Sequence, residues 1–260
     1  MIGAQKYAAP DPASGSKTRD YRARIYAQYS SGRHERLAPA SIEALSQSGP
    51  YLSRLVSRHF PPDRKAIVLD LGCGHGSLVH FARHSGYLNV RGVDSSVEQV
   101  EAASRLGIQN VELGDAIETL SAVPDSSCDV VVTFDVIEHF ARDEVLSLVD
   151  GVHRALRDGG RWIIHTVNAE SPFFGRIRYG DVTHETAYTR TSLGQLLLSS
   201  GFRRVDCYED SPVVHGVMSA MRFVLWQLIR GAMRLSIASE TGNSGRESIF
   251  SQNFLAVAVK

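Results

Sequence analysis

A glycine-rich run is the part of this 260-residue sequence that points most directly to a binding site. The run DLGCGHG fills positions 70–76, so that Gly72, Gly74 and Gly76 occupy every second position. Glycine has no Cβ, and it therefore permits a positive φ and a close approach of the backbone to a bound molecule. Such a turn at the carboxyl end of a parallel strand predicts a cofactor site.

The spacing of the glycines discriminates between cofactors. The fingerprint for nicotinamide dinucleotides places its third glycine one position later, where this chain has Ser77. That departure favours an adenosyl amino acid over a cofactor with a pyrophosphate. Asp70, at the end of the preceding strand, is expected to orient the turn or to meet the ligand's ammonium group through water. A turn that serves only to pack the strand on the next helix is the alternative.

Acidic residues follow the next strands in the order that such a site requires. Asp94 lies about twenty residues after the turn, where a carboxylate can accept hydrogen bonds from both hydroxyls of a ribose. Asp115 is placed to receive an adenine amino group, with Ala116 and Ile117 against the ring. The convergence of these residues at successive strand ends favours a cofactor site over a purely structural turn.

A second group of residues suggests how an acceptor would be activated. Asp135, Glu138 and His139 follow the fourth strand, and His184 lies in a loop after the fifth. A hydroxyl acceptor must lose its proton, either to a positioned histidine or with the help of a metal that stabilises the alkoxide. Carboxylates and imidazoles also form divalent metal sites. The sequence leaves three readings open: a metal held by all four, His184 or His139 as a base, and purely structural roles.

Strand-like and helix-like segments alternate along most of the chain, which predicts an α/β fold with a doubly wound, mostly parallel sheet. Strands are expected at 66–71, 89–93, 111–113, 128–134, 161–167, 202–208 and 254–259, and helices at 77–85, 96–105, 117–123, 143–157 and 191–200. The apolar runs in 128–134 and 161–167 predict strands covered on both faces.

The chain divides into a flexible tail at 1–20, an N-terminal helical lid at 21–62 and a main domain at 63–260 with a helical insertion at 211–250. The lid is expected to contain helices at 21–31 and 42–60, the second interrupted at Gly49-Pro50. In the lid, Tyr29 and Arg33 could close on the carboxylate of a cofactor, because arginine binds carboxylates in bidentate fashion.

The composition excludes several classes of protein. Lys and Arg together number 28, as do Asp and Glu, so a nucleic-acid partner is not expected. Three cysteines without paired or metal-ligand spacing argue against a disulfide framework and fit a reducing cytoplasm. The sequence shows neither a signal peptide nor an apolar stretch long enough to span a membrane, and a cytoplasmic protein is therefore expected.

The insertion carries a long apolar segment at 213–238 whose only formal charges are Arg222, Arg230 and Arg234. The three arginines share one helical face with Trp226, which is typical of an interfacial helix that touches anionic lipid. This predicts peripheral contact with the inner face of a membrane. Packing of the helix over the active site or onto a second subunit of a homodimer is the alternative.

Residues 66–201 resemble class I S-adenosylmethionine-dependent methyltransferases, including the ubiquinone-biosynthesis O-methyltransferase group. The glycine motif of that family matches positions 70–76, its ribose acid matches Asp94 and its adenine-side acid matches Asp115. The resemblance implies S-adenosylmethionine as cofactor. It also implies a seven-stranded sheet whose last strand is antiparallel.

The residues after the fourth strand narrow the acceptor. The run FDVIEHF at 134–140 lacks the Asn/Asp-Pro-Pro-aromatic motif of enzymes that methylate nucleic-acid amino groups. It is similar to metal-dependent O-methyltransferases, in which an acid-x-x-Glu-His run pairs with a later histidine. The segment YGDVTHE at 179–185, with the arginine-bearing insertion, resembles methyltransferases of bacterial surface-polysaccharide biosynthesis. That resemblance implies a sugar hydroxyl on a lipid-linked or nucleotide-linked glycan, or another small-molecule acceptor.

The expected cofactor site comprises Tyr29, Arg33, Asp70, Gly72, Cys73, Gly74, Gly76, Asp94, Ser95, Asp115, Ala116, Phe134, Asp135 and His139. The expected catalytic residues are His184 and His139. The leading hypothesis is O-methylation by an S-adenosylmethionine-dependent enzyme. The alternatives are a nicotinamide-dependent oxidoreductase and a non-catalytic module that binds S-adenosylmethionine.

Overall fold

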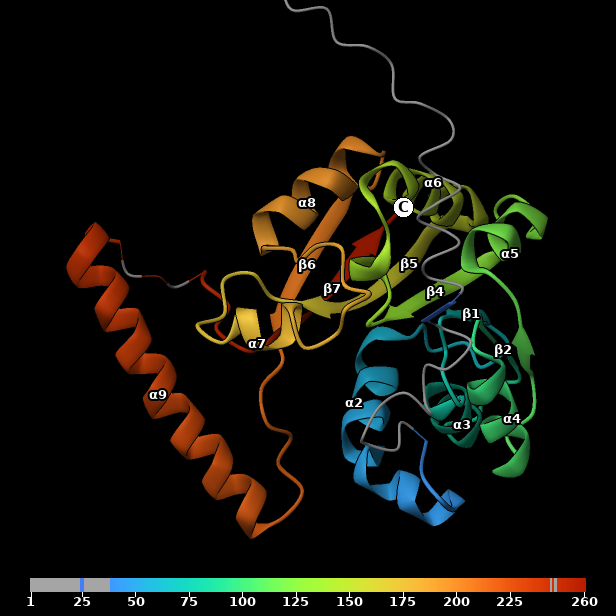
Figure 1. Ribbon diagram of the computed structural model, residues 1–260, viewed down its shortest axis with the longest axis horizontal. Coiled ribbons are helices and arrows are strands. Elements are labelled where there is room, and N and C mark those ends of the chain that lie inside the picture. Colours follow the sequence, from blue (N-terminus) through green and yellow to red (C-terminus); the bar gives the residue numbers. More distant parts are fainter. Residues whose placement is uncertain (1–23, 26–37, 244, 246) are drawn as a thin grey trace, which may run out of the picture.

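The computed structural model of this chain describes residues 24–25, 38–243, 245 and 247–260. A single sheet organises them, with strand order β3-β2-β1-β4-β5-β7-β6 (Figure 1). The neighbours among β1 to β5 pair in parallel, whereas β7 runs antiparallel to both β5 and β6. The predicted doubly wound sheet of seven strands with an antiparallel last strand is confirmed.

The strands are β1 (Ile67–Leu71), β2 (Asn89–Asp94), β3 (Val111–Leu113), β4 (Cys128–Phe134), β5 (Leu156–Val167), β6 (Arg204–Glu209) and β7 (Asn253–Val259). The α-helices are α2 (Gly49–His59), α3 (Ser77–His84), α4 (Val97–Arg105), α5 (Ala116–Ala122), α6 (Arg142–Ala155), α7 (Phe174–Arg178), α8 (Arg190–Ser199) and α9 (Val217–Thr241). Two short 3₁₀ helices, η1 (Ile42–Gln47) and η2 (Ile137–His139), complete the described elements.

Helices cover both faces of the sheet, so that the central strands are buried on each side. Leu120 of α5, Leu148 of α6 and Leu193 of α8 belong to one apolar layer. The layer on the other face includes residues of α2, α3 and α4. Figure 1 shows the two groups of helices on opposite sides of the strands. Burial of apolar area on both faces, at about 25 cal/mol per Å², stabilises the framework that holds the loops at the strand ends.

The end of α6 differs from the sequence expectation. A helix was expected to run to position 157 and to end at the Asp-Gly-Gly run, but α6 ends at Ala155 and β5 begins at once with the buried Leu156. The pairing of β4 with β5 shifts its register just after Leu156, and Gly159 has a φ of 76°. The Asp-Gly-Gly run is therefore an irregularity inside a strand, which glycine accommodates.

The helical segment before the sheet also differs from the expectation. Gly49-Pro50 begins α2 instead of interrupting a helix, because proline suits the first helical turn. Leu55 and Val56 of α2 lie in the apolar core on one face of the sheet, so this part of the expected lid packs as core. The expected tail at 1–20 and the proposed lid residues Tyr29 and Arg33 lie outside the described residues.

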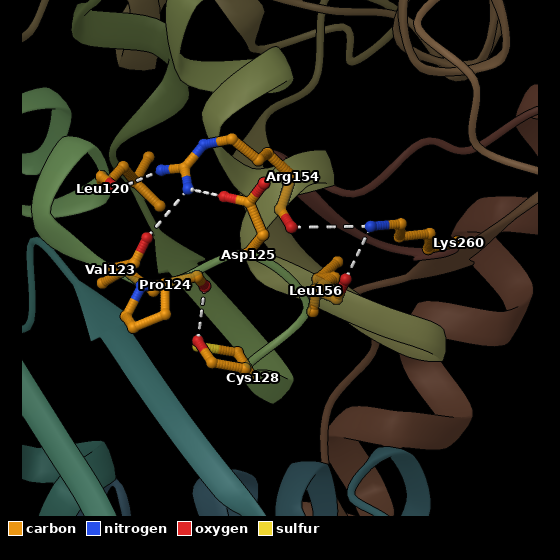
Figure 2. A network of polar contacts seen from close by, with 9 residues as sticks. Leu120, Val123, Pro124, Asp125, Cys128, Arg154, Leu156 and Lys260 are labelled. Carbon is orange, nitrogen blue, oxygen red and sulfur yellow. Dashed lines mark hydrogen bonds and ion pairs between the residues drawn. The ribbon is translucent and has the colours of Figure 1, made fainter.

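A network of hydrogen bonds lies at the end of the sheet where β4 and β5 begin (Figure 2). The guanidinium of Arg154 donates to the carbonyl oxygens of Leu120 at 2.5 Å and Val123 at 2.8 Å. The Nζ atom of Lys260 donates to the Leu156 carbonyl at 2.7 Å. These bonds satisfy carbonyl groups at the ends of α5 and α6. They tie the helices to the edge opposite the carboxyl ends of the strands.

The insertion between β6 and β7 forms the long helix α9, which lies at the edge of the molecule (Figure 1). None of the described helices is long and apolar enough to cross a bilayer. The arginines expected to form one exposed edge differ in their surroundings. Arg230 pairs with Glu209 of β6 and is half-buried, as is Trp226, whereas Arg222 is exposed. The expectation missed this difference because Glu209, the partner of Arg230, is distant from it in the sequence.

A comparison of two glycines with positive φ distinguishes the effect of backbone strain from the effect of close packing. Gly72 in the turn after β1 has a φ of 69°, and a Cβ there would lie 2.3 Å from Cγ2 of Val136. Gly107 has a similar φ of 73°, but a Cβ there would have no neighbour within 4 Å. The turn after β1 therefore depends on glycine for two reasons, and Gly107 depends on it for only one.

We expect Gly72→Ala to lower the free energy of unfolding by about 2–4 kcal/mol, from left-handed strain and from contact with Val136 together. Gly107→Ala should cost only the strain, about 1 kcal/mol. Urea unfolding of the two variants and the wild type measures the difference. Equal losses in the two variants would show that Val136 moves aside and that the turn does not depend on this contact.

Candidate functional site

A cavity of about 890 Å³ opens at the carboxyl ends of the parallel strands. Of the residues expected at the site, Gly72, Gly74, Asp94, Ser95, Asp115, Ala116, Phe134, Asp135, Glu138, His139 and His184 line this cavity. β1 and β4 are neighbours in the sheet, and the helices that follow them, α3 and α6, pack on opposite faces. This divergence opens a crevice at the carboxyl ends of the two strands, where ligands bind in folds of this kind. The structure thus brings most of the expected residues together around one space.

Three expected residues lie behind the lining. Asp70 is almost completely buried, and its Oδ1 atom has no hydrogen-bond partner among the residues that the structure describes. Burial and the nearby carboxyl of Asp94 raise its pKa well above the usual range. Cys73 packs against Gly92, and a Cβ at Gly76, just before α3, would lie 2.7 Å from Cγ2 of Val111. These three residues shape the turn instead of lining the cavity.

The carboxylate of Asp94 links the turn to the end of β2. Its Oδ2 atom accepts a hydrogen bond from the backbone N–H of Gly74 at 2.7 Å, and its Oδ1 atom accepts one from Ser96 at 2.8 Å. Burial raises the pKa of Asp94, and the two backbone hydrogen bonds oppose that shift. A carboxylate has about four acceptor sites, so two remain for the hydroxyls of a ribose.

Asp115 is held at the start of α5 by the capping role of its side chain. Its Oδ1 atom accepts hydrogen bonds from the backbone N–H groups of Ile117 at 2.8 Å and Glu118 at 3.0 Å. This leaves Oδ2 as an acceptor toward the cavity that Asp115 lines. Sequence reasoning missed Gln99, which lines the same region and contacts Nδ1 of His75 at 3.3 Å.

Glu138, His139 and His184 form a compact cluster on the cavity wall. One potential ligand atom from each lies within 4.8 Å of the others. The rings of His139 and His184 are 4.7 Å apart between centroids and nearly edge to face. The three residues come from η2 and from the loop after α7, which meet where the backbone carbonyl of Glu138 accepts hydrogen bonds from that loop. The cluster could act as a base or hold a cation.

Hydrogen bonds determine which nitrogen of each histidine carries a proton. The Thr183 hydroxyl donates to Asp181 at 2.6 Å, so it accepts from Nδ1 of His139 at 2.9 Å. Nδ1 of His184 lies 3.1 Å from the carbonyl oxygen of Ile177, to which it must donate. In the neutral state both histidines therefore present Nε2 as the nitrogen with the lone pair. Sequence reasoning had not assigned Asp181 and Thr183 to this site.

Glu138 is fully buried beside the two histidines. Its Oε2 atom accepts a hydrogen bond from Thr166 at 2.9 Å, whereas Oε1 has no such partner among the described residues. Burial, followed by the negative charge of Asp135, raises the pKa of Glu138 to about 8. A buried carboxyl with an uncommitted oxygen is a chemically significant feature, because most buried polar atoms are hydrogen-bonded.

Asp135 does not join this cluster, and its expected role as a fourth metal ligand is wrong. It has a positive φ of 56°, and its Oδ1 atom lies 2.6 Å from Nδ1 of His165 on β5. Proximity in sequence to Glu138 suggested a shared site, but the turn directs Asp135 toward a different partner. Asp135 still lines the cavity and can contact a cofactor.

His165 is the functional neighbour that sequence reasoning missed, because it stands in an otherwise apolar strand. Its ring stacks on Phe134 at 4.0 Å, and its Nε2 atom lies 3.4 Å from Asp210, just after β6. Burial lowers the pKa of His165, but Asp135 and Asp210 together outweigh burial and raise it to about 10. A buried imidazolium thus connects the cavity to the base of the insertion.

Comparisons with known proteins agree with this geometry. The family described as "Methyltransferase domain" matches residues 45–206. The ubiquinone biosynthesis O-methyltransferase of Rickettsia felis is 30% identical over 124 residues, or 45% of this chain and 48% of that protein. A probable S-adenosylmethionine-dependent methyltransferase of Mycolicibacterium smegmatis is 31% identical over 147 residues, or 54% and 52% of the two chains. The chain spans about half the length of the curated relatives it matches.

Solved structures share the fold at lower identity. A methyltransferase dependent on S-adenosylmethionine from Archaeoglobus fulgidus has a TM-score of 0.61 and 22% identity, over 84% of this chain and 97% of that chain. The phosphoethanolamine N-methyltransferase 2 of Haemonchus contortus has a TM-score of 0.57 and 18% identity, over 94% of this chain and 60% of that chain. The similar proteins carry names for both O- and N-methylation, so the fold does not specify the acceptor atom.

We expect His165→Gln to lower the free energy of unfolding by about 2–3 kcal/mol near pH 6, because Asp135 and Asp210 lose their shared cation. The pKa of His165 is raised from 6.5 to about 10. Its stabilising effect is therefore complete below about pH 6.5 and is lost as the pH rises through about 10. Urea unfolding of both proteins from pH 6 to pH 10 should show the gap closing.

His84→Gln is the matched control, since His84 is exposed on α3. It should unfold like the wild type across the same pH range. If the gap between the wild type and His165→Gln were the same at pH 6 and pH 10, the charged form of His165 would not be the stabilising one.

Proposed function

Because this chain belongs to the methyltransferase-domain family, we propose that it transfers a methyl group from S-adenosylmethionine to a hydroxyl group of a small molecule or glycan. One observation carries the choice of hydroxyl. Two histidines on the cavity wall, His139 and His184, each commit Nδ1 to a hydrogen bond and present Nε2 as a proton acceptor. A hydroxyl acceptor needs such a group, because its oxygen is a weak nucleophile while it keeps its proton.

The cofactor fits the end of the cavity formed by the turn. Gly72 and Gly74 place no side chain there, and Asp94 retains acceptor sites for a ribose after its two backbone bonds. We assign the adenine amino group to Asp115. We also propose that Tyr29 and Arg33, which lie outside the described residues, bind the carboxylate of the cofactor. When bound, S-adenosylmethionine supplies an electrophilic methyl group on a sulfonium.

His184 is the proposed base. The acceptor oxygen loses its proton to Nε2 of His184 as it bonds to the methyl carbon, while the electrons of the breaking carbon–sulfur bond remain on sulfur. The carbonyl of Ile177 orients the imidazole and stabilises the cation that forms. His139, oriented by Thr183, lies beside His184, with 4.7 Å between the centroids of the two rings. In-line transfer needs the acceptor between this pair and the cofactor.

A divalent cation is the second way in which the same cluster could activate the acceptor. Glu138, His139 and His184 combine one carboxylate with two imidazoles, a set that binds divalent transition metals. The uncommitted Oε1 atom of the buried Glu138 fits such a ligand. A bound ion would lower the pKa of a coordinated hydroxyl. The residues that hold the acceptor are the same in both cases.

The far wall of the cavity suits a polar acceptor. Arg176, Ile177, Gly180 and Asp181 contribute to it from α7 and the loop that follows. A cation and a carboxylate around a small apolar surface can bind the hydroxyl groups of a sugar or of a hydroxylated ring. The names of the ubiquinone biosynthesis relatives support a hydroxyl acceptor.

Transfer of a labelled methyl group to phenolic, sugar and amine acceptors tests the proposal. We expect a hydroxyl acceptor to be methylated, and we expect His184→Ala to lower kcat by about 10²–10⁴-fold with little change in S-adenosylhomocysteine affinity. Chelation should leave the rate unchanged if His184 is the base, and should abolish it reversibly if the cluster holds an ion.

His84→Ala, on the exposed side of α3, is the control and should retain full activity. Methylation of amines alone would contradict the proposal, as would an unchanged rate in His184→Ala. Tight binding of S-adenosylhomocysteine without turnover on any acceptor would indicate a binding module.

A further inference from the structure

The outer face of α9 is a broad apolar surface that no described element covers. We define it by Val217, Met218, Met221, Leu225, Leu228 and Leu235, each more than half exposed. Figure 1 shows α9 at the edge of the molecule, set apart from the sheet. A surface helix normally turns its apolar side inward, and a contiguous exposed apolar patch of this kind marks an interaction site.

The inner side of α9 explains why the apolar side faces outward. Arg230 pairs with Glu209 at 2.5 Å, and Glu209 also accepts a hydrogen bond from the backbone N–H of Phe250 at 2.9 Å. Ser219 is buried and bonds to the backbone before the helix. The pair of Arg230 with Glu209 thus ties the helix to β6, and Ser219 fixes the start of the helix. The outer face is left for another partner.

The charge pattern favours a lipid surface over a second copy of the chain. The sequence has no acidic residue between Asp210 and Glu240, a stretch that includes three arginines. Helices that pair with each other usually carry charged residues of both signs along the edges of the apolar stripe. Among the described residues 217–239, Arg222 is the exposed charge beside the outer face. A single cation beside aliphatic side chains complements anionic headgroups above an acyl layer.

We propose that the outer face of α9 lies in the interfacial layer of an anionic membrane. The helix has 25 residues and is about 37 Å long, and its apolar side chains lie along one face, which suits an orientation in the plane of the bilayer. A crossing orientation is not available, since none of the described helices meets the length and apolarity needed for a membrane span. The inference does not depend on the acceptor proposed above.

Flotation with lipid vesicles tests the proposal on the full chain. The wild type should float with vesicles containing phosphatidylglycerol and bind those of phosphatidylcholine alone more weakly, with the difference reduced by salt. Leu228→Glu should lower the partition coefficient at least about tenfold, because it places a charge in the acyl boundary. Arg222→Glu should reduce the preference for phosphatidylglycerol.

Leu88→Glu is the matched control, because Leu88 is 65% exposed and Leu228 is 67% exposed, on different parts of the molecule. Thermal melting should show that all variants are folded. The proposal is overturned if the wild type does not bind anionic vesicles, or if Leu88→Glu weakens binding as much as Leu228→Glu. A dimer in sedimentation that Leu228→Glu dissociates, without vesicle binding, would instead assign the face to a second copy.

Discussion

The carboxylate of Asp94 is the constraint around which this site is arranged. It binds the backbone N–H of Gly74 on one side and that of Ser96 on the other, and so fixes the turn after β1 against the end of β2. The turn can approach this closely because Gly72 leaves room for Val136. The two apolar layers keep the strand ends in register, so one half-buried carboxylate can set both the shape of the turn and the polarity of the cavity floor.

A second set of charged residues lies between the cavity and the insertion. The buried imidazolium of His165 holds Asp135 on one side and Asp210 on the other, which keeps Asp135 away from Glu138, His139 and His184. Directly before Asp210, Glu209 pairs with Arg230 of α9. Consecutive acids at the end of β6 therefore connect the cavity to the helix that we propose lies on a membrane.

The sequence predicted those features that depend on local spacing. The bounds of β3 and β4 agree with the expectation, and the cavity gathers Gly72, Asp94 and Asp115 as their strand-end positions implied. Contacts between distant segments could not be predicted in this way. The apolar run at 161–167 gave no indication of a role for His165, since its carboxylate partners come from other segments. The period of α9 revealed two faces, but only the pair with Glu209 shows which face turns inward.

Calorimetric titration with S-adenosylhomocysteine tests the central assignment, Asp94 as the ribose ligand, most directly. We predict that Asp94→Ala raises Kd at least about 100-fold, because two charge-assisted hydrogen bonds are lost. Asp150→Ala, at an exposed position on α6, should bind like the wild type. Affinity near that of the wild type in a folded Asp94→Ala variant would contradict the account.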